Sequence, residues 1–126
     1  MKQKNKITLV VSSLSGGGAE GVCVNIANEF AECGWVVDLV VLNLSNESFL
    51  SRVSRKVNLV VLNINHIRYA SISLLNYVRK NKINTVMVFS HELAVIFVII
   101  RILFRLKINI ISRNISILSI KIKILF

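Results

Sequence analysis

The chain has 126 residues, of which 54% are hydrophobic and 17% charged, and its net charge is +10. This length has room for one domain with one core, and the high apolar content is the opposite of a disordered composition. The absence of Pro and the presence of only five Gly exclude collagen-like and Pro-rich chains. No apolar run approaches the ~20 residues of a membrane-spanning helix, and Met1–Lys6 lacks the pattern of a signal peptide. We therefore expect a cytoplasmic globular domain.

Basic and acidic residues are distributed unevenly. Residues 1–50 contain three Lys against five acids, whereas residues 51–126 contain thirteen Lys and Arg against Glu92 alone. A basic half indicates an anionic partner. Because its cations alternate with Ile, Leu and Phe, the pattern favours an anionic membrane surface over a nucleic acid, whose binding proteins offer stacking aromatics. The alternative is that the excess of Lys, Ile and Asn reflects only the codon bias of an AT-rich genome.

The first third of the chain predicts a strand, a loop, a helix and a second strand. Ile7–Ser12 is a β-branched run typical of a strand buried on both faces, and a glycine-rich turn follows at residues 13–18. A helix begins at Ala19 and is ended by Gly34, and Trp35–Leu42 is the second strand. The apolar stripe of this helix comprises Val22, Ile26, Ala27, Phe30 and Ala31.

The alternation of strands and helices continues to residue 112. After an irregular stretch with a short helix near residues 47–52, we expect strands at 57–62, 85–89 and 108–112 and helices at 66–80 and 91–105. The helix at 66–80 carries Ile67, Ile72, Leu75 and Val78 as its apolar positions. Strands separated by helices favour right-handed crossovers and a parallel sheet. The predicted fold class is α/β, a Rossmann-like three-layer sandwich with a parallel sheet in strand order 3-2-1-4-5.

Residues 115–126 do not fit this pattern. Ile and Lys alternate over Ile120–Ile124 as in an exposed strand, although the predicted sheet is complete at Ser112. A domain is expected to cover its last strand. We therefore divide the chain into a domain at residues 1–114 and a tail at residues 115–126, and interpret the tail as that of a truncated chain.

A glycine-rich motif lies between the first strand and the first helix. Gly16–Gly21 matches G-x-G-x-x-G, in which the glycines permit close backbone approach and the helix N-terminus attracts an anion. Two features argue against NAD binding: Ser12–Ser15 separate the strand from the first glycine, and the second strand ends at Asn43 instead of an acid, since Asp38 lies too early. The alternative interpretation is a tight strand–helix turn without a ligand.

Residues 6–42 resemble the start of a family 4 glycosyltransferase. The resemblance rests on Ser12–Glu20 (SSLSGGGAE), Asn25–Ala31 (NIANEFA) and Cys33–Val37 (CGWVV). It extends through Asn84–Ser90, which resembles the fourth strand of that family, and Ile111–Asn114, which resembles the S-x-N turn that closes its fifth strand. The family usually has Arg where this chain has Gly21.

The resemblance implies the N-terminal, acceptor-binding half of a GT-B fold. The nucleotide-sugar donor would bind a missing C-terminal domain with a Glu-x7-Glu motif, and the family needs no metal or other cofactor. The implied reaction transfers a hexose to a lipid-linked or saccharide acceptor in the synthesis of capsule, O-antigen or lipopolysaccharide. Such an enzyme would lie peripherally at the inner face of the plasma membrane, and the isolated chain is expected to be inactive.

Candidate site residues follow from the glycine-rich loop and from the strand ends. The resemblance puts the loop near the donor phosphates, and open α/β sheets bind ligands beyond the carboxyl ends of their strands. We expect substrate or donor-phosphate contacts at Gly16, Gly17, Gly18, Glu20, Glu92, Arg113 and Asn114. His91 is the candidate catalytic base. The alternative for the segment Ser90–Glu92 is a helix N-cap followed by an acid in the first turn. His66 is expected to be a solvated residue at the start of a helix.

Cysteines and histidines give no further site. Cys23 and Cys33 are expected to be reduced packing residues, because ten residues on one helix separate them by roughly 15 Å. Two His and six acids spread in this way predict neither a metal site nor a catalytic triad. The alternative to a glycosyltransferase is a non-catalytic Rossmann-like module that binds a dinucleotide or docks on a membrane.

Overall fold

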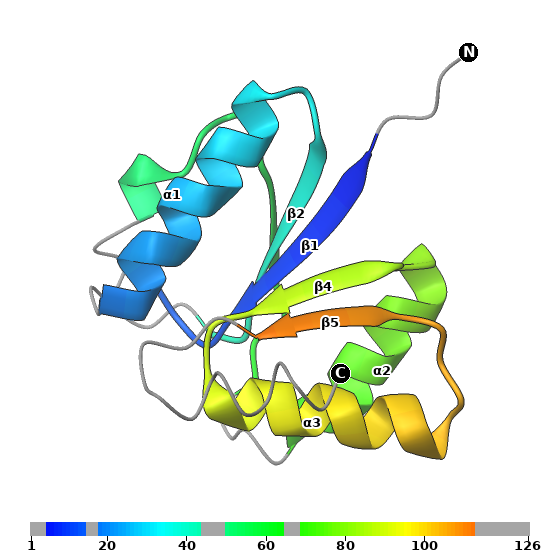
Figure 1. The fold of residues 1–126 in the computed structure, drawn as a ribbon. Coiled ribbons are helices and arrows are strands. Elements are labelled where there is room, and N and C mark those ends of the chain that lie inside the picture. Colours follow the sequence, from blue (N-terminus) through cyan, green and yellow to red (C-terminus); the bar gives the residue numbers. More distant parts are fainter. Residues whose placement is uncertain (1–4, 15–17, 44–49, 65–68, 113–126) are drawn as a thin grey trace.

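A computed structural model describes residues 5–14, 18–43, 50–64 and 69–112, which form a five-stranded parallel sheet with helices on both faces (Figure 1). The strands are β1 (Lys6–Val11), β2 (Val36–Val41), β3 (Asn58–Val61), β4 (Thr85–Val88) and β5 (Asn109–Ser112). Their order in the sheet is β3-β2-β1-β4-β5, and every neighbouring pair is parallel. The predicted α/β class and the predicted strand order are confirmed.

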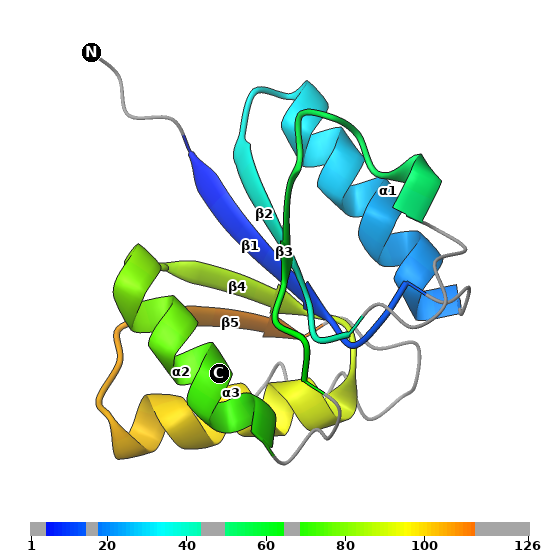
Figure 2. The same ribbon diagram turned by 180° about the vertical axis from the view of Figure 1, so that it is seen from behind.

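The helices form two layers, one on each face of the sheet. The helix α1 (Gly18–Glu32) packs on β1 and β2, whereas α2 (Ala70–Asn81) and α3 (His91–Leu103) lie on the opposite face (Figures 1 and 2). A short 3-10 helix, η1 (Leu50–Arg52), stands where a short helix was expected near residues 47–52. The predicted helix at 66–80 corresponds to α2, although residues 65–68, with His66 and Ile67, lie outside the described residues.

The two faces of the sheet have separate apolar cores, because successive side chains of a strand point to opposite faces. Leu9, Leu39 and Cys23 belong to the core under α1. Val10, Val40 and Phe97 belong to the core under α2 and α3. From their second residue onward β1 and β2 are buried on both faces, as their continuous β-branched sequences predict.

Two of the predicted apolar stripes are corrected by the structure. The face of α1 that packs on the sheet comprises Cys23, Val24, Ala27 and Ala31, and the predicted stripe members Val22, Ile26 and Phe30 are only half-buried. On α2 the buried positions are Ala70, Leu74, Leu75 and Val78, whereas Ile72 is exposed. In both helices the sequence offers apolar residues over more than half the circumference. The rotation that the packing selects therefore could not be read from periodicity alone.

The end of α1 shows how the sequence sets an element boundary. Gly34 has a φ of 90°, in the left-handed region that favours glycine. The Gly34 N–H donates to the Ala31 carbonyl at 3.1 Å and the Trp35 N–H donates to the Phe30 carbonyl at 3.0 Å. These two bonds are the Schellman pattern, and the rings of Phe30 and Trp35 meet edge to face with their centroids 4.9 Å apart. The predicted helix stop at Gly34 is confirmed.

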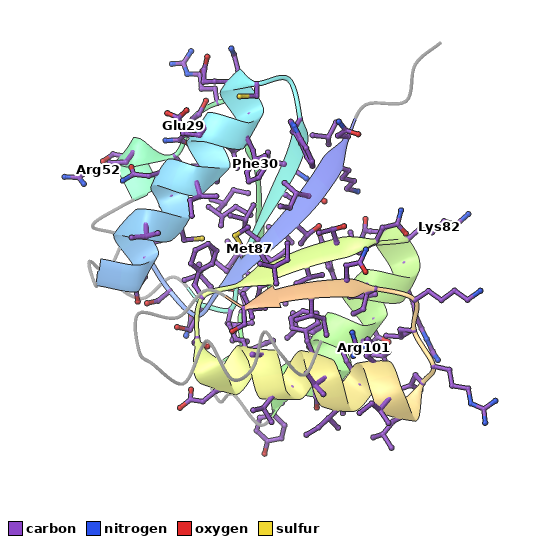
Figure 3. All side chains as sticks on the ribbon, in the orientation of Figure 1. Glu29, Phe30, Arg52, Lys82, Met87 and Arg101 are labelled. Carbon is purple, nitrogen blue, oxygen red and sulfur yellow. The ribbon has the colours of Figure 1, made fainter. Side chains whose placement is uncertain are left out.

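The α1 face of the sheet is only partly covered by described residues. Met87 of β4 is half-buried and Ile111 of β5 is 39% exposed on this face. Figure 3 shows Phe30 and Met87 on the same side of the sheet, with α1 beside the central strands and no described helix beyond it over β5. The opposite face of the same two strands lies under α3.

Candidate functional site

The strand order places a topological switch point between β1 and β4. These two strands are hydrogen-bonded neighbours, with Val10 opposite Val88 near their carboxyl ends. The chain leaves β1 towards α1 on one face and leaves β4 towards α3 on the other (Figure 1). Open α/β sheets bind ligands in the crevice that this divergence opens outside the carboxyl ends of the strands. The candidate site is this edge of the sheet.

The connection from β1 to α1 begins at this edge of the sheet, and its residues 12–14 are described. Leu14 is fully buried and anchors the connection in the core under α1. The Ser13 hydroxyl donates to Glu20 Oε1 at 3.4 Å, and Glu20 stands in the first turn of α1, where the helix dipole favours a carboxylate. Gly18 is the first residue of α1, while Gly16 and Gly17 lie outside the described residues. The role of Ser13 was not predicted.

The connection from β4 to α3 begins at the same edge of the sheet. Ser90 has extended backbone angles, and its hydroxyl accepts a hydrogen bond from the Leu93 N–H at 3.2 Å. The predicted alternative of an N-cap at Ser90 is therefore confirmed. Glu92 is exposed in the first turn of α3, and His91 is the first residue of this helix, with a side chain that the structure does not describe. Both residues therefore belong to the helix start at this edge of the sheet.

The ends of β2 and β5 complete the same edge. The Asn43 N–H donates to the Ser12 carbonyl at 3.2 Å, so the loops after β1 and β2 remain side by side beyond the strands. Ser112 ends β5, and its buried hydroxyl has no hydrogen-bond partner among the described residues. The predicted contacts Arg113 and Asn114 follow it directly and lie outside those residues.

Asp38 takes part in a polar cluster away from this edge. It lies on the face under α2, in register with Thr8 and Asn58. The Asp38 carboxylate accepts from the Tyr77 hydroxyl at 2.9 Å and from Asn58 Nδ2 at 3.1 Å, and Lys6 Nζ is 3.4 Å away. Burial, followed by the hydrogen bond to Asp38, raises the pKa of Tyr77 above its ordinary value.

This cluster supports the expectation that Asp38 cannot hold a ribose at the carboxyl edge, because its oxygens are already engaged near the amino ends of the strands. Sequence reasoning did not find the cluster. A single acid within the apolar strand VVDLVV is the signal that could have indicated it, because a buried carboxylate needs partners.

The two cysteines have different environments. Cys23 is fully buried, and burial, followed by the nearby charge of Glu20, raises the pKa of its thiol. The prediction of a packing residue is confirmed for Cys23. Cys33 is exposed beyond the end of α1, so the same prediction is wrong there. Among the described residues, no group of three His, Cys, Asp or Glu side chains could hold a metal ion.

A separate hollow lies at the opposite edge of the sheet. It has a volume of about 590 Å³ and is lined by residues that precede or begin strands, among them Lys6, Trp35, Asn84 and Thr85. We do not assign the substrate site here, because parallel α/β sheets bind ligands beyond the other ends of their strands.

The fold and the strand order define this chain as a doubly wound α/β protein with a candidate ligand site at the switch point. No protein-family model matches the chain, and no curated protein matches it significantly. In the part of the chain that the structure describes, every helix is too short or too polar to span a bilayer.

Proposed function

We propose that this chain is the acceptor-binding domain of a family 4 glycosyltransferase with a GT-B fold. The observation that carries the proposal is that two sequence segments follow neighbouring strands at the same edge of the sheet. The glycine-rich segment that resembles this family leads into α1, and the segment Ser90–Glu92 leads into α3 from the adjacent strand. A ligand between the two helix starts would contact both segments.

The proposed reaction transfers a hexose from a nucleotide-sugar to a lipid-linked or saccharide acceptor used in surface polysaccharide synthesis. The acceptor oxygen bonds to the anomeric carbon, the bond from that carbon to the diphosphate oxygen breaks, and the nucleoside diphosphate leaves with the electron pair. His91 would accept the proton of the acceptor hydroxyl. The backbone N–H groups at the start of α1, beside the glycine-rich loop, would stabilise the charge on the diphosphate. The donor would be held mainly by a second, C-terminal domain.

The second candidate function is a dinucleotide-binding module, which the formal G-x-G-x-x-G match of Gly16–Gly21 favours. The acid that would hold a ribose is missing from the end of β2, where Asn43 stands. Asp38 cannot replace it, because its carboxylate is buried and already accepts hydrogen bonds from Tyr77 and Asn58. The glycosyltransferase is therefore the better supported proposal.

Amide chemical shifts of the full chain provide the test. The protein is titrated separately with nucleoside diphosphate sugars, with a short-chain lipid-diphosphate saccharide and with NAD. We expect the lipid-linked saccharide to move the amide signals of Ser13, Glu20, Ser90 and Glu92, and to leave those of Trp35 and Asn84 at the opposite edge unchanged. A response to NAD alone would replace the proposal by the dinucleotide module. Shifts at Trp35 and Asn84, or no response to any ligand, would refute the proposed site.

The variant Gly17→Val separates a ligand-binding loop from a tight turn. A side chain at this position would occupy the space of a bound ligand. We therefore expect the affinity measured by the chemical-shift titration to fall at least about tenfold, while the melting temperature changes little. The control is Glu29→Gln on the exposed outer side of α1, which leaves both quantities unchanged. Unfolding of Gly17→Val, or unaltered binding, would show that the loop is structural.

A further inference from the structure

The outer face of α3 is apolar although it faces solvent. Of the 13 residues of this helix only His91, Glu92 and Arg101 are polar. Leu93, Phe97 and the other inward residues pack on the sheet, which accounts for one side of the helix. Five large apolar side chains remain exposed along the outer side and at the C-cap, and we call them the α3 surface: Val95, Ile99, Ile102, Leu103 and Phe104. Ile102 and Leu103 are 67% and 70% exposed.

The neighbouring helix of the same layer differs. The exposed positions of α2 include Asn76, Arg79, Lys80 and Asn81, and only Ile72 among the exposed residues within this helix is a large aliphatic. A codon bias towards Ile would act on both helices. The apolar character of the outer face is therefore specific to α3. Such a face on a helix indicates contact with another apolar phase.

Cations follow the far end of the α3 surface in the sequence or lie on the neighbouring helix. Exposed Arg105 and Lys107 follow α3 directly, and Lys82 stands at the end of α2, next to the amino end of β4 (Figure 3). The guanidinium carbon of Arg79 lies 4.9 Å from the centre of the Phe104 ring, so one cation makes a cation–π contact with a residue of the α3 surface. Residues 69–112 contain six Lys and Arg against Glu92 alone, whereas Glu20, Glu29 and Glu32 lie on α1, across the sheet.

We infer that the α3 surface docks on an anionic phospholipid bilayer. A helix of 13 residues is about 20 Å long, and when it lies in the interface its apolar side enters the boundary between headgroups and acyl chains while nearby Lys and Arg meet anionic headgroups. A second copy of this chain is the less suitable occupant, because two such faces would bring like charges together. The inference does not depend on the proposed transferase activity, since it rests only on the exposure and charge of this face.

Vesicle flotation of the full chain tests the inference. The protein is mixed with vesicles of phosphatidylcholine alone and with vesicles in which about a third of the lipid is phosphatidylglycerol. We expect binding to the anionic vesicles only, and weaker binding as the salt concentration rises, because salt screens the headgroup charges. Equal binding to both vesicle types, or binding to neither, would overturn the inference.

A matched pair of charge reversals locates the surface. Arg105→Glu/Lys107→Glu and Arg55→Glu/Lys56→Glu change the net charge equally at exposed positions, but the second pair lies between η1 and β3, away from α3. Each cation next to an anionic membrane contributes roughly fivefold to partitioning, so we expect the first variant to bind at least about 30-fold more weakly and the second to bind nearly as the wild type does. Equal losses in both variants would show that net charge alone acts, and would refute the α3 surface.

The apolar part is tested with Leu103→Ser and, as its control, Val36→Ser at the exposed start of β2. We expect only Leu103→Ser to weaken vesicle binding, and circular dichroism to show that both variants fold, because both side chains are exposed. Sedimentation velocity is measured in parallel. If the wild type dimerises without binding vesicles and Leu103→Ser is monomeric, the occupant is a second copy and the inference is wrong.

Discussion

Two acidic residues form ion pairs of equal length in very different surroundings. Asp38 is 3.4 Å from Lys6 Nζ and Glu32 is 3.4 Å from Lys56 Nζ. The Asp38 side chain is 7% exposed and that of Glu32 is 61% exposed. Asp38 also accepts hydrogen bonds from the buried side of α2 and from β3, which Glu32 does not do among the described contacts. The distance between two charges therefore does not indicate how much the pair stabilises the fold.

We expect Asp38→Ala to lower the free energy of unfolding by about 3 kcal/mol, because the half-buried Tyr77 hydroxyl and the Asn58 amide lose their buried acceptor. Glu32→Ala is the control and should cost less than about 1 kcal/mol, since solvent screens its ion pair. Urea unfolding of both variants at neutral pH measures the two values. Equal costs would contradict the assignment of Asp38 as a buried structural acid.

At the scale of elements, Tyr77 attaches α2 to the sheet. Its hydroxyl donates to Asp38 Oδ2 of β2 at 2.9 Å, in addition to the apolar contacts of Leu74 and Val78. The hydrogen bond exists only while Tyr77 keeps its proton. The raised pKa of Tyr77 in the folded state therefore links the docking of α2 to pH.

The variant Tyr77→Phe tests this link. At about pH 7 we expect it to be less stable than the wild type by about 1–2 kcal/mol, because the hydrogen bond to Asp38 is lost. Above about pH 10 the unfolded wild type releases the Tyr77 proton before the folded protein does, so wild-type stability falls as pH rises and the difference between the two proteins shrinks. Urea unfolding at several pH values measures this difference. A constant difference up to about pH 11 would disprove the link.

At the scale of the whole molecule, the described residues cover the two faces of the sheet unequally. Ile110 and Ile111 are consecutive residues of β5 and point to opposite faces. Ile110 is 7% exposed under α3, whereas Ile111 is 39% exposed on the face that carries α1. Charge is also divided between the layers, with acids on α1 and cations on α2 and after α3. The charge of the molecule is therefore asymmetric across the sheet, and the basic layer lies on the side of the α3 surface.

Alanine substitution of Ile110 and Ile111 tests how much the burial of each side chain contributes to the free energy of unfolding. We expect Ile110→Ala to cost about 3 kcal/mol of unfolding free energy, because it leaves a cavity in the core under α3. Ile111→Ala should cost less than about 1 kcal/mol, because its side chain is partly solvated in the folded state. Both values come from thermal or urea unfolding. Similar losses at both positions would mean that the α1 face over β5 is covered as well as the opposite one.

The sequence by itself determined the elements and their order. Continuous β-branched runs predicted β1 and β2, Gly34 predicted the end of α1, and the alternation of strands and helices predicted the parallel order 3-2-1-4-5. These predictions succeeded because backbone preference, glycine conformation and crossover handedness act locally or through chain connectivity. The position of the candidate site followed from the same order, since the switch point lies wherever neighbouring strands diverge to opposite faces.

Only the tertiary structure decided which side of each helix is buried and which polar groups meet. α1 and α2 are apolar over wide arcs, so the exposure of Ile72 and the partial burial of Phe30 depended on how each helix rotates against the sheet. Asp38, Asn58 and Tyr77 are far apart in the sequence and meet because register aligns two strands beneath a helix. The exposed apolar side of α3 likewise required the packed structure, because an all-round apolar helix does not reveal from its sequence which face the sheet will cover.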